Sequence, residues 1–175
     1  MLIFLIWHIF LADVIPLFKN NLIDTIPVLY EQFDITFELY INGEMHTNWR
    51  NVLRLTNTNN KQGNIGDRIA IFEVRGDLSE AILTTDAGKP SKSVLHNKTI
   101  SAETWIPTRI QQAVVDNRFK MMLWFNNEEV GEILMDRPQL LNDTQIFAGD
   151  PYTAVLPGTI KNLNISTGKD KLLHL

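Results

Sequence analysis

The segment Phe33-Asp34-Ile35-Thr36-Phe37-Glu38-Leu39-Tyr40-Ile41 alternates, residue by residue, between large apolar side chains and more polar ones. Successive side chains of a β-strand point to opposite faces of its sheet, so this period of two predicts a strand with one buried and one exposed face. The expected strand covers 31–41. Asn42-Gly43 follows it, and both residue types tolerate the positive φ of a tight turn. The segment therefore predicts a long, half-buried strand that ends in a turn.

Other parts of the chain have the same alternation in shorter pieces, separated by polar stretches rich in Gly, Asn, Asp and Pro. Loops are expected at 58–64 and 86–97. Further strands are expected at 48–56, 69–74, 80–84, 105–115, 119–125, 130–135, 144–148 and 158–165. No stretch of a dozen residues keeps an apolar stripe at helical spacing. Short strands at this regular spacing are typical of an antiparallel sandwich or barrel, so the expected fold class is all-β.

The hairpin around Asn126-Asn127 has two alternative registers. Pairing Phe125 with Val130 would bury Glu132, whereas a slip of one residue would bury Ile133 and Met135 instead. We favour the slipped register because an unpaired buried carboxylate is costly.

Length, charge and cysteine content limit the classes of protein to consider. The 175 residues suit one domain, and the sequence contains no internal repeat and no linker. Sixteen Lys and Arg residues against 20 Asp and Glu give a net charge of −4, without a basic cluster, so a nucleic-acid partner is not expected. The absence of cysteine excludes disulfides, thiolate metal sites and a cysteine nucleophile.

The apolar run Met1–Ala12 fits the apolar part of a secretory signal peptide, since spanning a bilayer takes roughly 20 residues. We therefore expect a signal peptide over 1–12, a single β-sandwich domain over 13–166 and a C-terminal tail over 167–175. The mature protein would then be secreted and have no membrane span. Two alternatives stay open: a buried first strand, or a signal anchor that extends through Phe18.

Three N-x-S/T triplets agree with a secretory route, because such triplets are acceptors for N-linked glycans in secreted proteins. The candidate glycosylation sites are Asn97, Asn142 and Asn164.

Several segments together carry a resemblance to a known family. They are Phe33–Leu39, Asn51–Thr56, Ile65–Ile69, Trp105, the hairpin over 119–135, Ala148–Tyr152 and Gly158–Leu163. In their order and local patterns, residues 20–166 resemble the concanavalin A-like lectin/glucanase superfamily, which includes galectins, laminin G-like domains and pentraxins. The resemblance implies an antiparallel two-sheet jelly-roll β-sandwich. It looks like the extracellular modules of this superfamily in invertebrate animals.

His46-Thr47-Asn48-Trp49-Arg50 fits the galectin sugar-binding spacing H-x-N-x-R. Period two would place His46, Asn48 and Arg50 on one strand face, opposite Leu53 and Leu55. An imidazole, an amide and a guanidinium can jointly bond sugar hydroxyls. The next loop, however, lacks the tryptophan of the galectin pattern, and the later Asn and Glu-x-Arg elements are missing. The alternative is that these residues form a polar turn after Asn42-Gly43, followed by a strand with one solvent-exposed face.

Trp124 alternates out of the apolar face of its strand, so it is a candidate stacking platform for a ligand. The alternative is that Lys120, Met122 and Trp124 lie beneath a covering loop. The candidate ligand-binding residues are thus His46, Asn48, Arg50 and Trp124.

Catalytic and metal-binding patterns are missing from the sequence. The E-x-D-x-E spacing of β-glucanases, a G-x-S-x-G elbow and the zinc motifs are all absent. Relatives in the superfamily that the chain resembles bind calcium through loop Asp and Asn groups, and Asp86, Asp116, Asn117 and Asp150 are available for this. The sequence has no EF-hand pattern, and we expect no metal or cofactor. We therefore expect a secreted, non-catalytic module whose partner is a glycan. An adhesion or matrix module that binds an extracellular protein is the alternative, and the oligomeric state is left undetermined.

Overall fold

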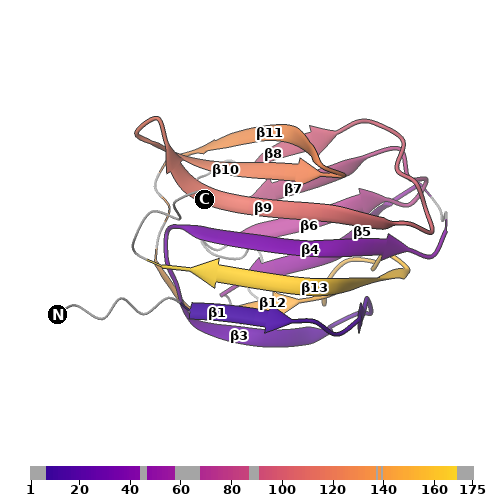
Figure 1. Ribbon diagram of the computed structural model, residues 1–175, viewed down its shortest axis with the longest axis horizontal. Helices are drawn as coiled ribbons and strands as arrows, with labels where there is room; N and C mark the ends of the chain where they lie inside the picture. The colour runs from indigo at the N-terminus through magenta and orange to yellow at the C-terminus, as the bar shows by residue number, and fades with distance from the viewer. Residues whose placement is uncertain are drawn as a thin grey trace.

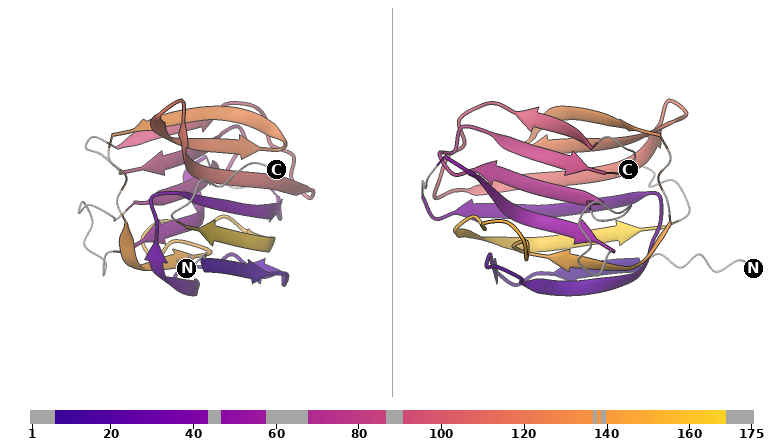
Figure 2. Two further views of the ribbon diagram at one scale, coloured as in Figure 1. Left: turned by 60° about the vertical axis from the view of Figure 1, so that its left-hand side comes forward. Right: turned by 180° about the vertical axis from the view of Figure 1, so that it is seen from behind.

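The computed structural model describes residues 7–43, 47–57, 68–86, 91–136, 138 and 140–168. These residues form two antiparallel sheets that lie one behind the other (Figures 1 and 2). Helix is absent from the described residues, and none of them forms an apolar helix of membrane-spanning length. The all-β, two-sheet class expected from the sequence is confirmed.

Sheet A, at the front of Figure 1, has seven strands in the order β1-β13-β4-β9-β10-β11, and β2 also pairs with β13. Its strands are β1 (Trp7–Leu11), β2 (Ile15–Pro16), β4 (Phe33–Ile41), β9 (Trp105–Val115), β10 (Arg118–Phe125), β11 (Glu128–Met135) and β13 (Gly158–Thr167). Sheet B has six strands in the order β3-β12-β5-β6-β7-β8. They are β3 (Leu22–Leu29), β12 (Leu141–Phe147), β5 (Trp49–Thr56), β6 (Ala70–Arg75), β7 (Ala81–Thr85) and β8 (Lys92–His96).

A row of aromatic rings joins the two sheets through the core. Phe37 of sheet A contacts Phe72 of sheet B with ring centroids 6.1 Å apart, and Phe72 contacts Phe125 of sheet A at 5.5 Å. Phe125 in turn meets His96 of sheet B at 5.2 Å. All three Phe side chains are at most 3% exposed. Tilted and edge-on ring pairs add to the stabilisation from burial. This row of rings therefore makes a large contribution to the packing of one sheet on the other.

The favoured register of the β10–β11 hairpin is confirmed. Ile133 and Met135 are buried, whereas Glu132 is exposed. The slip is achieved by a β-bulge in β11: Leu123 is paired with Gly131 and Trp124 with Glu129, so the pairing skips Val130. Gly131 has a φ of 149°, and a Cβ at this position would lie 2.8 Å from the Val94 side chain. A glycine therefore allows the bulge and the close approach of sheet B.

The strands β2, β3 and β8 were not expected from the sequence, and β1 was open only as an alternative to a signal peptide. The prediction of a loop over 86–97 is wrong, because Lys92–His96 forms β8 at the edge of sheet B. β3 was also missed, and it contains Pro27, which cannot donate a backbone hydrogen bond. β3 lies at the other edge of sheet B, where proline is tolerated.

At the N-terminal side, Trp7–Leu11 pairs with β13 as strand β1, and Ile9 is 7% exposed in the core. This is the arrangement of the first-strand alternative. Cleavage of a signal peptide after Ala12 stays a prediction, and it would remove β1. At the other end, β13 continues through Thr167, one residue beyond the expected boundary at 166. The Thr167 hydroxyl accepts a hydrogen bond from the Tyr30 N–H, which fastens it to the fold.

Candidate functional site on the outer face of sheet A

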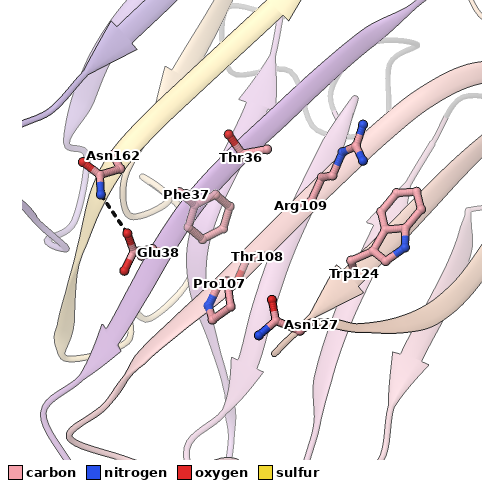
Figure 3. Close-up of a pocket in the computed structure, with 9 residues that line it drawn as sticks. All are labelled: Thr36, Phe37, Glu38, Pro107, Thr108, Arg109, Trp124, Asn127 and Asn162. Carbon is pink, nitrogen blue, oxygen red and sulfur yellow. Dashed lines mark hydrogen bonds between the residues drawn. The ribbon is translucent and has the colours of Figure 1, made fainter. Parts of the chain in front are cut away.

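A shallow groove of about 450 Å³ runs over the outer face of sheet A (Figure 3). Strands β13, β4, β9 and β10 and the β10–β11 turn supply its lining: Thr36, Phe37, Glu38, Pro107, Thr108, Arg109, Trp124, Asn127 and Asn162. Thr36 is directly opposite Arg109, and Arg109 is directly opposite Trp124. Opposed residues of antiparallel strands share a face, so these three side chains form one row across the sheet.

Trp124 is half-buried, and its indole packs against the side chain of Arg109. The guanidinium carbon of Arg109 lies 5.0 Å from the centre of the indole. Asp34 accepts two parallel hydrogen bonds from Arg109, from Nε at 2.9 Å and from Nη2 at 2.6 Å. A two-pronged ion pair of this kind fixes the plane of the guanidinium, and the stacked cation then fixes the ring. Trp124 lies on the outer face, as its alternation predicts.

Asparagine and glutamate side chains provide hydrogen-bonding groups beside the aromatic ring. Asn162 Nδ2 donates to Glu38 Oε1 at 2.7 Å (Figure 3). Lys161 Nζ lies 3.3 Å from Glu38 Oε2. Asn162 and Asn127 have positive φ values of 53° and 62°, a left-handed conformation that asparagine tolerates well. Asn162 occurs where the β13–β4 register shifts, and Asn127 occurs in the two-residue turn between β10 and β11.

Of the galectin-like triplet, His46 lies outside the described residues. Asn48 is exposed just before β5, and its backbone carbonyl accepts a hydrogen bond from the Gly76 N–H. The structure does not bring Asn48 to the groove on sheet A, because β5 belongs to sheet B.

Arg50 does not have the orientation expected from strict alternation. It is paired with Val74, while Leu53 is paired with Phe72, and both partners point into the core. A β-bulge before Leu53 changes the phase of the strand, so Arg50 shares the face of Leu53 rather than opposing it. Arg50 is half-buried, and its Nε is buried without a hydrogen-bond partner. The expectation that Arg50 lies on the face opposite Leu53 and Leu55 is therefore wrong.

The outer face of sheet B has a second, smaller hollow of about 200 Å³. Arg54 and Asp150 form an ion pair in it, with 2.5 Å between Nη1 and Oδ2, and their side chains are 3% and 0% exposed. The ring of Tyr152 packs on Arg54, with 4.7 Å from the guanidinium carbon to the ring centre. Asp150 also accepts hydrogen bonds from the Tyr152 and Thr153 N–H groups. Residues 150–153 are thus fastened over this face of the sheet.

Glu73 borders the same hollow. Burial raises the pKa of the Glu73 carboxyl, and the negative charge of Asp150 raises it further, although Arg54 and Arg68 act in the opposite direction. Two carboxyl groups in one hollow resemble the acid pair of a glycosidase. Here, however, both oxygens of Asp150 accept hydrogen bonds within the protein. This carboxylate is therefore committed to holding residues 150–153 in place.

Comparison with solved structures identifies the architecture. The fold is similar to that of a heptameric SAP-like pentraxin from Limulus polyphemus, with a TM-score of 0.61, 14% identity, and coverage of 88% of this chain and 76% of that chain. The fold is that of a concanavalin A-like jelly roll. The CBM40 of a Ruminococcus gnavus IT-sialidase, bound to α2,3-sialyllactose, gives a TM-score of 0.58 at 11% identity over 93% of this chain and 94% of that chain.

Domains LG4-5 of the mouse laminin α1 chain give a TM-score of 0.59 at 13% identity, over 92% of this chain and 44% of that chain. No family model matches the sequence, and neither does any curated protein sequence. The family resemblance inferred from strand order is therefore confirmed at the level of the jelly-roll fold.

The four candidate calcium ligands lie on three separate connections of the jelly roll. Asp116 and Asn117 form the β9–β10 turn, Asp86 follows β7 beside Arg68, and Asp150 follows β12. Within the described part of the chain, no three His, Cys, Asp or Glu side chains are grouped so as to hold a metal ion.

We predict that Asn97 and Asn142 carry N-linked glycans in a secretory cell, and that Asn164 does not. Asn97 and Asn142 are exposed, whereas Asn164 is half-buried between β1 and β4, with its Oδ1 enclosed. A glycan on Asn164 would press against the neighbouring strands. Peptide mass spectrometry after enzymatic glycan release checks this, with Asn97→Gln and Asn142→Gln variants as controls. Detection of a glycan on Asn164 of the folded protein would contradict it.

Proposed function

We propose that the protein is a secreted, non-catalytic module that binds a glycan in the groove of sheet A. The observation that carries the proposal is the fixed, half-exposed indole of Trp124 at the end of a row of polar side chains. The C–H face of a sugar ring packs on an aromatic ring, and its hydroxyls accept and donate hydrogen bonds at the edges. Asn127, Asn162 and Thr36 offer both kinds of polar partner.

The fold supports this proposal by analogy. A jelly roll of similar fold and nearly equal extent is the Ruminococcus gnavus module seen with sialyllactose. Fold alone does not determine function, and the groove supplies the side chains that would contact a sugar.

The carboxylates of the groove argue for binding rather than hydrolysis. Asp34 is engaged by Arg109, and Glu38 is engaged by Lys161 and Asn162. The two acids are four residues apart on one strand, which separates them by about 13 Å at 3.3 Å per residue. Glycosidases hold their two carboxyl groups about 5–5.5 Å apart for retention and about 6.5–9.5 Å apart for inversion. Neither distance is met by this pair.

A second candidate function is adhesion through a protein partner. Val14, Phe18 and Leu22, which are close together in the sequence, are 48–57% exposed. Exposed apolar side chains that gather on a surface are a feature of protein contact sites. This candidate predicts binding to an extracellular protein that is insensitive to changes in the groove.

Trp124→Ala is expected to weaken glycan binding at least tenfold, which corresponds to about 1.4 kcal/mol. The reason is that the substitution removes the stacking surface, while Arg109 stays paired with Asp34. The measurement is a glycan array followed by titration calorimetry with the best neutral ligand. The matched control is Leu134→Ala, which removes a 43% exposed apolar side chain from neighbouring β11, outside the groove lining.

Both variants should retain the melting temperature of the parent to within a few degrees. Absence of binding to any glycan, or equal affinities for Trp124→Ala and the parent, would reject the proposal. Binding to a matrix protein by parent and Trp124→Ala alike would favour the adhesion candidate.

A further inference from the structure

A second aromatic cluster lies on the same outer face as the groove. Trp105, the first residue of β9, is 36% exposed. It is paired with Tyr40 of β4, and the two ring centres are 5.2 Å apart. Lys161 Nζ lies 4.1 Å from the centre of the indole. Trp105 is thus an exposed ring that packs against the Tyr40 ring and the Lys161 cation. Trp124 packs against the Arg109 cation in a similar way.

The two tryptophans flank the groove along β9. Trp105, Pro107 and Arg109 alternate along that strand, so they share its outer face. Trp105 and Arg109 are four residues apart, a separation of about 13 Å. Arg109 is opposite Trp124, and Pro107 belongs to the groove between the two aromatic clusters. A ligand in contact with both rings must be longer than a single sugar ring.

The charges that border the groove are balanced in pairs. Arg109 Nη2 lies 2.6 Å from Asp34, and Lys161 Nζ lies 3.3 Å from Glu38. A carboxylated or sulfated sugar would have to compete with these carboxylates for the cations, whereas a neutral sugar would leave both pairs intact.

We infer that the groove takes a neutral oligosaccharide that lies along β9, with one sugar ring on Trp124 and another on Trp105. This inference rests on the proposed function, since it gives the length and charge of the ligand in that same groove. Trp105 is then the distal subsite, reached only by longer chains.

The test uses the full chain and neutral glucan, mannan and galactan oligosaccharides of one to six units. Lactose and α2,3-sialyllactose serve as a further pair of probes that share the lactose unit and differ in the charged sialic acid. Calorimetry should show that affinity rises with chain length and then levels off. Trp105→Ala should lower the affinity for the longer chains at least tenfold and change that for the shortest bound chain less than twofold. Trp105→Phe, which keeps a ring, should restore most of the affinity. Sialyllactose should bind no more tightly than lactose.

Three results would overturn the inference while the proposed function stands: equal affinity for short and long chains, an unchanged length dependence in Trp105→Ala, or tighter binding of sialyllactose than of lactose. If Trp105→Ala loses its folded melting transition, Trp105→Phe and the length series of the parent protein decide the matter. Failure to bind any glycan, by contrast, rejects the proposed function itself.

Discussion

Replacement of Arg54 by alanine is expected to lower the free energy of unfolding by about 3–5 kcal/mol, because it leaves the carboxylate of Asp150 buried without its cation. Asp150 is fully buried, and Arg54 is 3% exposed. Residues 150–153 would also lose the guanidinium on which Tyr152 packs. Urea denaturation followed by intrinsic fluorescence measures the effect.

Two further variants give this prediction its controls. Arg68→Ala removes a 40% exposed arginine whose Nε is 3.5 Å from Asp86, and should cost less than about 1 kcal/mol. The double variant Arg54→Met with Asp150→Asn removes both buried charges and keeps an oxygen acceptor for the Tyr152 N–H. It should be more stable than Arg54→Ala alone. Equal losses for Arg54→Ala and Arg68→Ala would show that the buried pair has no special role.

Phe72→Ala is expected to cost about 3–5 kcal/mol, a large share of the roughly 5–15 kcal/mol that stabilises a typical domain. Phe72 is fully buried and contacts Phe37 and Phe125 of the facing sheet. Its removal opens a cavity and breaks the aromatic row between the layers. Chemical denaturation of parent and variant gives the difference.

The matched control is Phe18→Ala, which removes the same ring from a site that is 53% exposed and should change stability by less than about 0.5 kcal/mol. Phe72→Leu, which keeps part of the buried volume, should cost less than half of the alanine variant. A loss at Phe72 no larger than the loss at Phe18 would be inconsistent with the described core.

Strands with strict alternation were predictable from local sequence, and strands with bulges or edge positions were less so. β4 and β10 matched their expected ranges closely, since large apolar residues recur at every second position of both strands. The face on which Arg50 lies was predicted wrongly because a bulge in β5 interrupts the alternation. The position of this bulge depends on how β5 pairs with β6. β8 has one sheet neighbour and a short, mixed sequence, so its pattern resembled that of a loop.

Of the residues in the candidate site, only Trp124 could be predicted from the sequence. The positions of the others depend on how the strands pair. The outward orientation of Trp124 follows from alternation within its own strand. Its support does not, because Arg109 and Asp34 are 75 positions apart in the chain and meet only through strand pairing. Asn162 reaches the groove through a register shift in β13, which no local pattern indicates.

Residues 150–153, fastened over sheet B by the Arg54–Asp150 pair, use the charged groups of the smaller hollow for contacts within the chain. Under the proposed function, the groove on sheet A is then the single glycan site proposed among the described residues, and one copy binds one glycan branch. A monovalent binder cannot agglutinate cells. Lasting attachment to such a coat then calls for several copies held together, so that each bound groove raises the effective concentration of the next.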